Sequence, residues 1–265
     1  MRSNRVHNMF SGRDPVVVPF LTAGFPNRET FMSAAMASLD AGAGAIEIGM
    51  PFSDPLADGP AIQHSSQSAL ERGVTMEHVF EFAADLRSKT TKPIFLMGYL
   101  NPMLKRGIER FARNAAAAGV DGTIIPDCPI EEADNWTLAS RAAGLDNIFL
   151  IAPTSPDERV RRIDRLSTSF SYCVSIAGVT GARRDVSKAT IAYLRRVRRI
   201  AQKPFVVGFG ISAPAHVKSL SGLADGYVVG SALVPLLESG SRVVASKRVS
   251  DLIGSLVRAA SRSGA

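Results

Sequence analysis

The chain has 265 residues, of which 46% are hydrophobic and 21% charged, and its formal net charge is +7. These values are ordinary for a globular protein with a large core, and no run of about 18 apolar residues is present, so no membrane span is expected. Residues 1–10 lack the apolar segment of a signal peptide, which predicts a cytoplasmic protein.

Short apolar runs recur along the whole chain, and helical patterns separate them. The predicted strands are Val16–Leu21, Ala45–Gly49, Ile94–Met97, Gly122–Ile125, Ile148–Ile151, Ser171–Val174, Phe205–Gly208 and Gly226–Val229. The predicted helices include Thr30–Ala41, Ile108–Ala118, Glu131–Ala143, Pro156–Leu166, Lys188–Ile200 and Pro214–Leu220. Alternating strands and helices, with strands that are nearly all apolar, predict a parallel sheet buried on both faces.

Eight such units in a chain of this length predict an α/β fold, a single (β/α)8 TIM barrel made by residues 1–265. An open, doubly wound sheet is the alternative. Residues 1–14 are expected to form a short extension with a helix outside the barrel. Arg258–Ala265 is expected to be a frayed tail, because its residues are small and polar.

Charged and metal-binding residue types give little sign of a macromolecular partner or a metal site. The two cysteines and four histidines have no metal-ligand spacing, so no metal is expected. Arginines cluster within 161–162, 183–184 and 195–199, which fits either a nucleic-acid surface or solvated outer faces of helices. We favour solvated faces, because no aromatic residues interleave with the arginines.

The first candidate for chemistry is Glu47, near the end of the second predicted strand. In a barrel of this kind, catalytic groups lie at the C-terminal ends of the strands and in the loops that follow. Glu47 alternates with Ile46 and Ile48, so it is expected to face the barrel interior. Loss of hydration there should raise its pKa and suit it to acid/base catalysis. A solvated or paired glutamate is the alternative.

The loop after this strand contains three prolines and two aspartates, Asp54 and Asp58. Proline restricts the backbone, and a stiff loop at a strand exit commonly places side chains for function. Asp58 precedes Gly59 and Pro60, where a helix can begin. An ordinary turn aspartate is the alternative.

Glycine-rich segments follow the last three predicted strands. Residues 176–187 contain Gly178 and Gly181 and are expected to form a flap or a plain flexible loop. The segments at Gly208–Ser212 and Gly230–Ser231 occupy the places where barrels often bind phosphate through backbone N–H groups. Ordinary glycine turns are the alternative. A dinucleotide site at 208–213 is disfavoured, since the pattern falls on the penultimate strand.

Taken together, these segments resemble the tryptophan synthase α family. Residues 47–60 read EIGMPFSDPLADGP, against the family pattern E-L-G-x-P-F-S-D-P-x-A-D-G-P. Residues 19–24, 177–181 and 208–212 are further family signatures, in order and each at the expected strand exit. The chain departs from the family at Ile176, where some members carry arginine, and at Phe25, where aspartate is frequent.

The resemblance implies a lyase of tryptophan biosynthesis that cleaves indole-3-glycerol phosphate to indole and glyceraldehyde 3-phosphate. It implies that Glu47 is the acid/base and that Asp58 faces the indole N–H. It also implies that substrate is bound by Phe20, Tyr172, Thr180, Gly181, Phe209, Gly210, Gly230 and Ser231.

The resemblance further implies that the chain needs no metal or organic cofactor. Pyridoxal phosphate is expected only in a partner β subunit, which receives the indole within an α2β2 heterotetramer. The loop that carries Pro51 and Asp54 is expected to contact this partner. Three alternatives remain open: a stand-alone lyase without a β partner, a catalytically silent barrel that activates a partner, and a phosphate-binding barrel with a different sugar-phosphate substrate.

Overall fold

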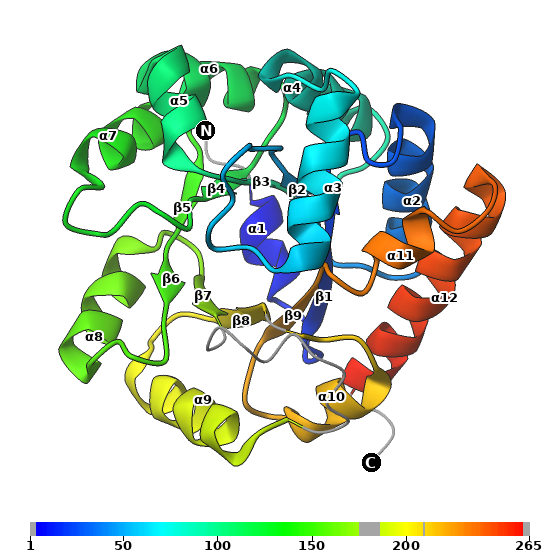
Figure 1. Cartoon of the computed structure of the whole chain (residues 1–265). Helices are drawn as coiled ribbons and strands as arrows, with labels where there is room; N and C mark the ends of the chain where they lie inside the picture. Colours follow the sequence, from blue (N-terminus) through cyan, green and yellow to red (C-terminus); the bar gives the residue numbers. More distant parts are fainter. Residues whose placement is uncertain (1–3, 175–185, 209, 262–265) are drawn as a thin grey trace.

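The computed structural model describes residues 4–174, 186–208 and 210–261, and it contains a parallel sheet that closes into a barrel (Figure 1). The strand order is β5-β4-β3-β2-β1-β9-β8-β7-β6, and every paired strand runs parallel to its neighbour. The strands are β1 (Val16–Thr22), β2 (Ile46–Gly49), β3 (Ile94–Met97), β4 (Gly122–Ile124), β5 (Asp146–Ile148), β6 (Leu150–Ile151), β7 (Ser171–Val174), β8 (Phe205–Gly208) and β9 (Gly226–Val229). The predicted (β/α)8 TIM barrel is confirmed.

Three predicted strands differ from β1, β2 and β4 by one residue at one end, and a fourth differs more. The expected strand Ile148–Ile151 begins earlier, at Asp146, and is divided at Phe149 into β5 and β6. β5 pairs with β4, whereas β6 pairs with β7. The two ends of the strand order are therefore consecutive pieces of one chain segment, and this segment closes the ring.

Helices surround the barrel, and their bounds agree with most of the predicted ones to within a few residues (Figure 1). Helix α9 matches its prediction at both ends, whereas α7 begins three residues after the expected Glu131. The helices are α1 (Arg5–Met9), α2 (Arg28–Asp40), α3 (Pro60–Glu71), α4 (Met76–Arg87), α5 (Leu100–Arg106), α6 (Ile108–Ala117), α7 (Asp134–Ala143), α8 (Asp157–Leu166), α9 (Lys188–Ile200), α10 (Pro214–Ser219), α11 (Val234–Leu237) and α12 (Arg242–Ala260).

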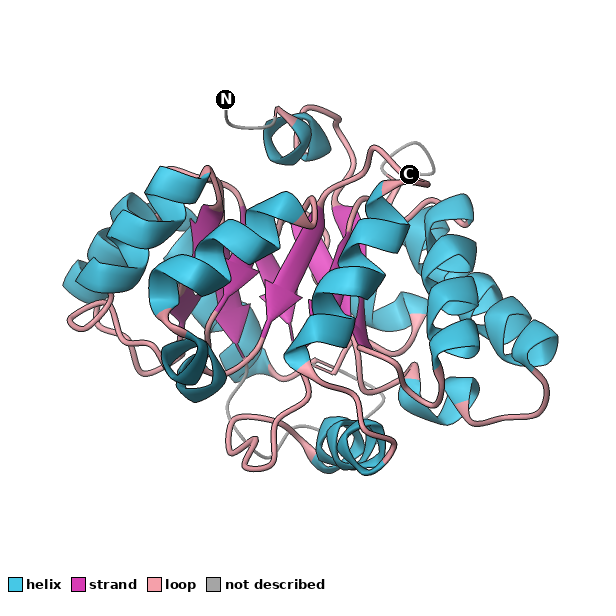
Figure 2. Ribbon diagram, turned by 90° about the horizontal axis from the view of Figure 1, so that it is seen from above, coloured by secondary structure: helices cyan, strands magenta, loops and turns pink. Residues whose placement is uncertain are grey.

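The first and last described helices, α1 and α12, both bury apolar side chains. Helix α12 continues to Ala260, inside the stretch expected to fray, because Leu256 and Ala260 are buried in the main core. Residues 262–265 lie outside the described residues. Helix α1 lies beyond the N-terminal ends of the strands, and its Val6 belongs to the apolar cluster inside the barrel (Figure 2). The predicted helix is thus confirmed, and it closes one end of the barrel.

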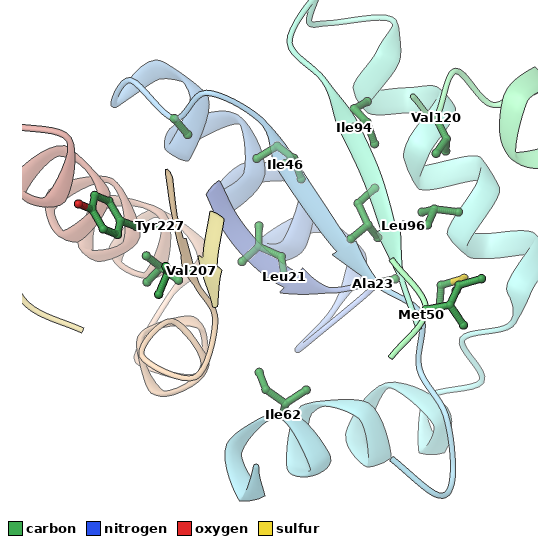
Figure 3. Packing of buried hydrophobic residues seen from close by; sticks show 14 of the residues in the cluster. Leu21, Ala23, Ile46, Met50, Ile62, Ile94, Leu96, Val120, Val207 and Tyr227 are labelled. Atoms are coloured by element: carbon green, nitrogen blue, oxygen red, sulfur yellow. The ribbon is translucent and has the colours of Figure 1, made fainter. Parts of the chain in front are cut away.

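Two apolar clusters follow from strand alternation. One fills the space between strands and helices and includes Ile46 and Leu96 (Figure 3), together with Ile48. The other fills the barrel interior and includes Phe95. Glu47 pairs in register with Phe95, and its immediate neighbours Ile46 and Ile48 face outward. The expectation that Glu47 faces the interior therefore agrees with the packing.

No helix among the described residues is both long and apolar enough to span a bilayer.

Candidate active site

A cavity of about 820 Å³ opens at the C-terminal ends of the strands. Its wall includes residues at or just beyond the ends of β1, β3, β4, β7, β8 and β9. Six residues predicted from the sequence to serve the site lie in this wall: Phe20, Asp58, Tyr172, Gly210, Gly230 and Ser231. Three others, Thr180, Gly181 and Phe209, lie outside the described residues. The structure thus brings strand exits that are far apart in sequence to one mouth.

Glu47 lies beneath this mouth rather than in the cavity wall. The residue is 1% exposed, and its Oε1 atom has no hydrogen-bond partner among the described residues. Burial, the larger cause, and the nearby charge of Asp58 together raise the pKa of the Glu47 carboxyl to about 8. A carboxyl of this kind holds its proton near neutral pH and can either donate or accept one.

Asp58 stands at the end of the loop between β2 and α3, where Gly59 caps α3 and Pro60 is its first residue. Its carboxylate is half-buried, and Oδ2 accepts a hydrogen bond of 3.0 Å from the hydroxyl of Tyr99. Burial raises the pKa of Asp58, whereas the hydrogen bond from Tyr99 lowers it, because the donor stabilises the charged form. The Tyr99 hydroxyl therefore favours an anionic Asp58 at the cavity wall.

Two aromatic side chains occupy space that neighbouring glycines leave open. A Cβ atom on Gly49 would lie 2.3 Å from Cζ of Phe20, and one on Gly208 would lie 2.0 Å from the hydroxyl oxygen of Tyr172. Glycine at these strand ends therefore lets both rings turn toward the cavity. Burial, followed by the charges of Glu47 and Asp58, raises the pKa of Tyr172 well above its usual value, so its hydroxyl keeps its proton.

The opposite rim of the cavity is formed after β8 and β9. Gly210 has a φ of +55°, in the left-handed region that favours glycine. A Cβ on Gly230 would lie 3.2 Å from the Phe20 ring, so this rim also approaches the aromatic wall closely. No bulky side chain is present at Gly210, Gly230 or Ser231, which leaves room for an anionic group to approach the backbone.

No group of three or more His, Cys, Asp or Glu side chains within the described ranges is placed to hold a metal ion. Cys128 is a buried residue of the cavity wall, and burial raises the pKa of its thiol to about 11. A thiol with this pKa is protonated at neutral pH and is a poor nucleophile. The carboxyl groups of Glu47 and Asp58 and the hydroxyl groups of Tyr99 and Tyr172 are the site's candidate groups for chemistry.

Sequence reasoning missed Tyr99, which makes the direct side-chain contact to Asp58. A usable signal was present, since Tyr99 follows the predicted strand Ile94–Met97 by two residues and so stands at a strand exit. The contact itself joins residues 41 positions apart, and no local pattern encodes it.

Comparison with known proteins gives a consistent result. Residues 7–258 match the family described as "Tryptophan synthase alpha chain". A tryptophan synthase alpha chain of Roseiflexus sp. (strain RS-1) is 48% identical over 241 residues, which is 91% of this chain and 92% of the relative. The one from Geotalea daltonii is 43% identical over 256 residues, covering 95% and 97%.

Solved structures agree with these relatives. A chain from a structure of Mycobacterium tuberculosis tryptophan synthase superposes with a TM-score of 0.89 at 35% identity, covering 98% of this chain and 99% of that one. A chain from the tryptophan synthase α2β2 complex of Pyrococcus furiosus gives a TM-score of 0.86 at 41% identity, covering 92% and 98%.

Proposed function

This chain belongs to the tryptophan synthase alpha chain family, and from that premise we propose which of its residues carry out the family's reaction. The reaction is the retro-aldol cleavage of indole-3-glycerol phosphate to indole and glyceraldehyde 3-phosphate, and the chain is a carbon–carbon lyase of tryptophan biosynthesis. The observation that carries our assignment of residues is the buried carboxyl of Glu47 beneath the cavity, whose Oε1 has no hydrogen-bond partner within the described part of the chain.

Glu47 is the acid/base of the proposed mechanism. Its protonated carboxyl donates a proton to the indole ring carbon that carries the glycerol chain, which gives an iminium-like indole. The resulting carboxylate takes the proton of the adjacent glycerol hydroxyl as the C–C bond breaks and the aldehyde forms. The electron pair of that bond returns to the indole ring, so one carboxyl serves both proton transfers. A pKa raised to about 8 suits this double role near neutral pH.

Asp58 stabilises the cationic indole in this mechanism. Protonation of the ring carbon places positive character on the indole N–H, and a nearby carboxylate is the complementary charge. The support for this role is the position of Asp58 in the cavity wall and the hydroxyl of Tyr99, which favours its charged form.

The remaining cavity wall has an aromatic part and a part that is proposed to bind an anion. Phe20 and Tyr172 would contact the indole and glycerol portions of the substrate, and Gly210, Gly230 and Ser231 would receive its phosphate. Thr180, Gly181 and Phe209 are proposed to complete this set on the strength of the family resemblance alone. The step moves only protons and the electrons of a C–C bond, so we propose that this chain uses neither a metal nor an organic cofactor.

We further propose that the chain acts with a β subunit in an α2β2 complex, as described for the protein of Pyrococcus furiosus. The proposed contact is the loop after β2 that carries Pro51 and Asp54. Leu56 in this same loop is 91% exposed, which suits an apolar contact with a partner. The pyridoxal phosphate of the complete enzyme would belong to that partner.

The reaction is tested by mixing the purified chain with indole-3-glycerol phosphate and measuring indole and glyceraldehyde 3-phosphate. We expect equal amounts of both products and competition by an indole-propanol phosphate analogue. A crystal soaked with this analogue should show its ring beside Asp58. An analogue bound elsewhere, or the absence of turnover, would contradict the proposal and favour a barrel that only activates a partner.

The partner is tested by mixing the chain with a β subunit encoded in the same genome. We expect one complex in gel filtration and a lyase rate higher than that of the chain alone. A mixture that elutes as two separate proteins, with an unchanged lyase rate, would instead indicate a stand-alone lyase.

A further inference from the structure

The loop between β2 and α3 is fixed at its start by a single buried hydroxyl group. Ser66 on α3 is 4% exposed, and its Oγ accepts a hydrogen bond of 2.8 Å from the backbone N–H of Phe52. The same hydroxyl donates a bond of 3.0 Å to the backbone C=O of Phe52. Both polar backbone groups of one loop residue are therefore held by one side chain of α3, which runs beside the barrel mouth (Figure 1).

The far end of the loop is fixed through Tyr99. The ring of Phe52 stacks on the ring of Tyr99, with centroids 5.1 Å apart and an interplanar angle of 29°. The Tyr99 hydroxyl accepts a bond of 3.0 Å from the backbone N–H of Ala57 and donates to Oδ2 of Asp58 at 3.0 Å. Contacts thus run without a break from Ser66 through Phe52 and Tyr99 to the carboxylate of Asp58.

We propose that Ser66 is a positioning residue of the lyase reaction, which acts on Asp58 through Phe52 and Tyr99. This inference rests on the proposed role of Asp58. The neighbouring hydroxyl of Ser65 serves a different purpose, because it bonds to Thr22 at 2.6 Å and to the backbone C=O of Ile62 at 2.9 Å. Ser66 is therefore distinguished from Ser65 by its contact with the loop that carries the charged group.

The physical reason for an effect on rate is geometric. A displacement of about 1 Å in a group that stabilises the transition state can cost up to about 100-fold in rate. Loss of the Ser66 hydroxyl frees the backbone of Phe52, and the ring of Phe52 then no longer holds Tyr99 and Asp58 at one position. The proposed phosphate-binding rim is formed by segments after β8 and β9, away from Ser66. Substrate binding through phosphate should therefore change little.

The first experiment compares Ser66→Ala with Ser68→Ala, a matched substitution on the same helix, by steady-state lyase kinetics. We expect Ser66→Ala to lower kcat about 10-fold with KM changed by less than about twofold, and Ser68→Ala to leave both unchanged. Ser66→Thr, which keeps the hydroxyl, should restore most of kcat. Equal kinetics for Ser66→Ala and Ser68→Ala would overturn the inference, and so would a Ser66→Thr variant as slow as Ser66→Ala.

The second experiment is a double-mutant cycle with Asp58→Asn, because a general loss of structure would also lower kcat. If Ser66 acts through Asp58, adding Ser66→Ala to Asp58→Asn should lower kcat by less than about twofold. A full 10-fold further loss would show that Ser66 acts elsewhere. Phe52→Leu can take the place of Ser66→Ala in this cycle and leaves helix α3 unchanged. We expect the same lack of additivity between Phe52→Leu and Asp58→Asn.

The two proposals fail in different ways. An Asp58→Asn variant with normal turnover would contradict the proposed role of Asp58 itself. An impaired Asp58→Asn variant combined with a normal Ser66→Ala variant would contradict only the positioning role of Ser66.

Discussion

Each end of the barrel contains a buried carboxyl group, and the two groups have different surroundings. Asp121 precedes β4 at the N-terminal end, where its side chain is 1% exposed and lies 2.7 Å from Arg5 and 3.5 Å from Arg87. It also accepts the backbone N–H of Ile94 at 2.9 Å. Glu47 near the C-terminal end of β2 is also buried, yet the described structure gives its Oε1 no partner and places Asp58 nearby.

The difference separates a structural carboxylate from a functional one. Asp121 links two helices to the sheet, since Arg5 belongs to α1 and Arg87 belongs to α4. Such pairing gives Asp121 a structural role. No ion pair to Glu47 is present among the described residues, and its raised pKa is the property that proton transfer requires. In this barrel the ion-paired carboxylate lies at the N-terminal end of the strands, and the candidate catalytic carboxyl lies near their C-terminal end.

The largest expected effect comes from Glu47→Gln, which preserves shape but removes the titratable group. We expect kcat to fall by at least about 1,000-fold, because general acid/base groups contribute on the order of 10²–10⁴-fold and this one serves two steps. The measurement is single-turnover formation of indole. Near-normal turnover would remove Glu47 from the mechanism.

The matching substitution at the other end is Asp121→Asn, for which we expect a loss of stability with little change in lyase activity. Loss of this charge removes the buried carboxylate that both Arg5 and Arg87 contact, and breaking a buried pair from one side costs about 3 kcal/mol. Urea unfolding should report that loss in the free energy of unfolding. Lyase activity of the folded variant should stay within about twofold of the wild type, since Asp121 lies at the opposite end from the cavity. An Asp121→Asn variant of unchanged stability would refute this half of the comparison.

The pH dependence of the free energy of unfolding should report the titration of Glu47. The pKa of Glu47 is about 8 in the folded chain, against 4.5 as its ordinary value. Between these values the folded chain binds more protons than the unfolded one, so the free energy of unfolding falls as pH rises. Below about pH 4.5 this loss is absent, and above about pH 8 it is complete.

A comparison with Glu47→Gln isolates this effect from the other titrating groups. The wild type should lose roughly 3 kcal/mol of stability relative to the variant between about pH 5 and pH 8, as followed by urea unfolding at each pH. Parallel curves for the two proteins would show that Glu47 titrates normally.

The smallest effect is expected from Tyr99→Phe. The variant keeps the ring that stacks on Phe52 but loses the hydroxyl that lowers the pKa of Asp58. The pKa of Asp58 should therefore rise, kcat at pH 7 should fall about 5-fold, and the acidic limb of the kcat profile should move to higher pH. A lowered kcat with an unmoved acidic limb would mean that Tyr99 does not act through the charge of Asp58.

Much of the fold could be predicted from the sequence because strand burial leaves a clear local pattern. The strands from Ile94, Ser171, Phe205 and Gly226 have the predicted bounds, since each is an apolar run buried on both faces. Helix α3 gave a weaker signal. Its buried face includes Ser65, Ser66 and Ala69 in place of large apolar residues, so apolar periodicity does not reveal it.

The candidate site divides in the same way. The orientation of Glu47 could be deduced from alternation with its isoleucine neighbours, and the aspartate-containing loop could be recognised from its prolines and its family pattern. The bonds of Tyr99 to Asp58 and of Ser66 to Phe52 could not, because they join separate elements through single hydroxyl groups. Such contacts exist only once the barrel has brought the elements together.

The most direct measurement is a ¹³C NMR titration of the Glu47 side-chain carboxyl, assigned by comparison of the wild type with Glu47→Gln. Our account predicts a midpoint at about pH 8, with the group still protonated at neutral pH. A midpoint near 4.5, the ordinary value for glutamate, would contradict it. The carboxyl beneath the cavity would then be an ordinary anion, and a different group would have to supply the proton.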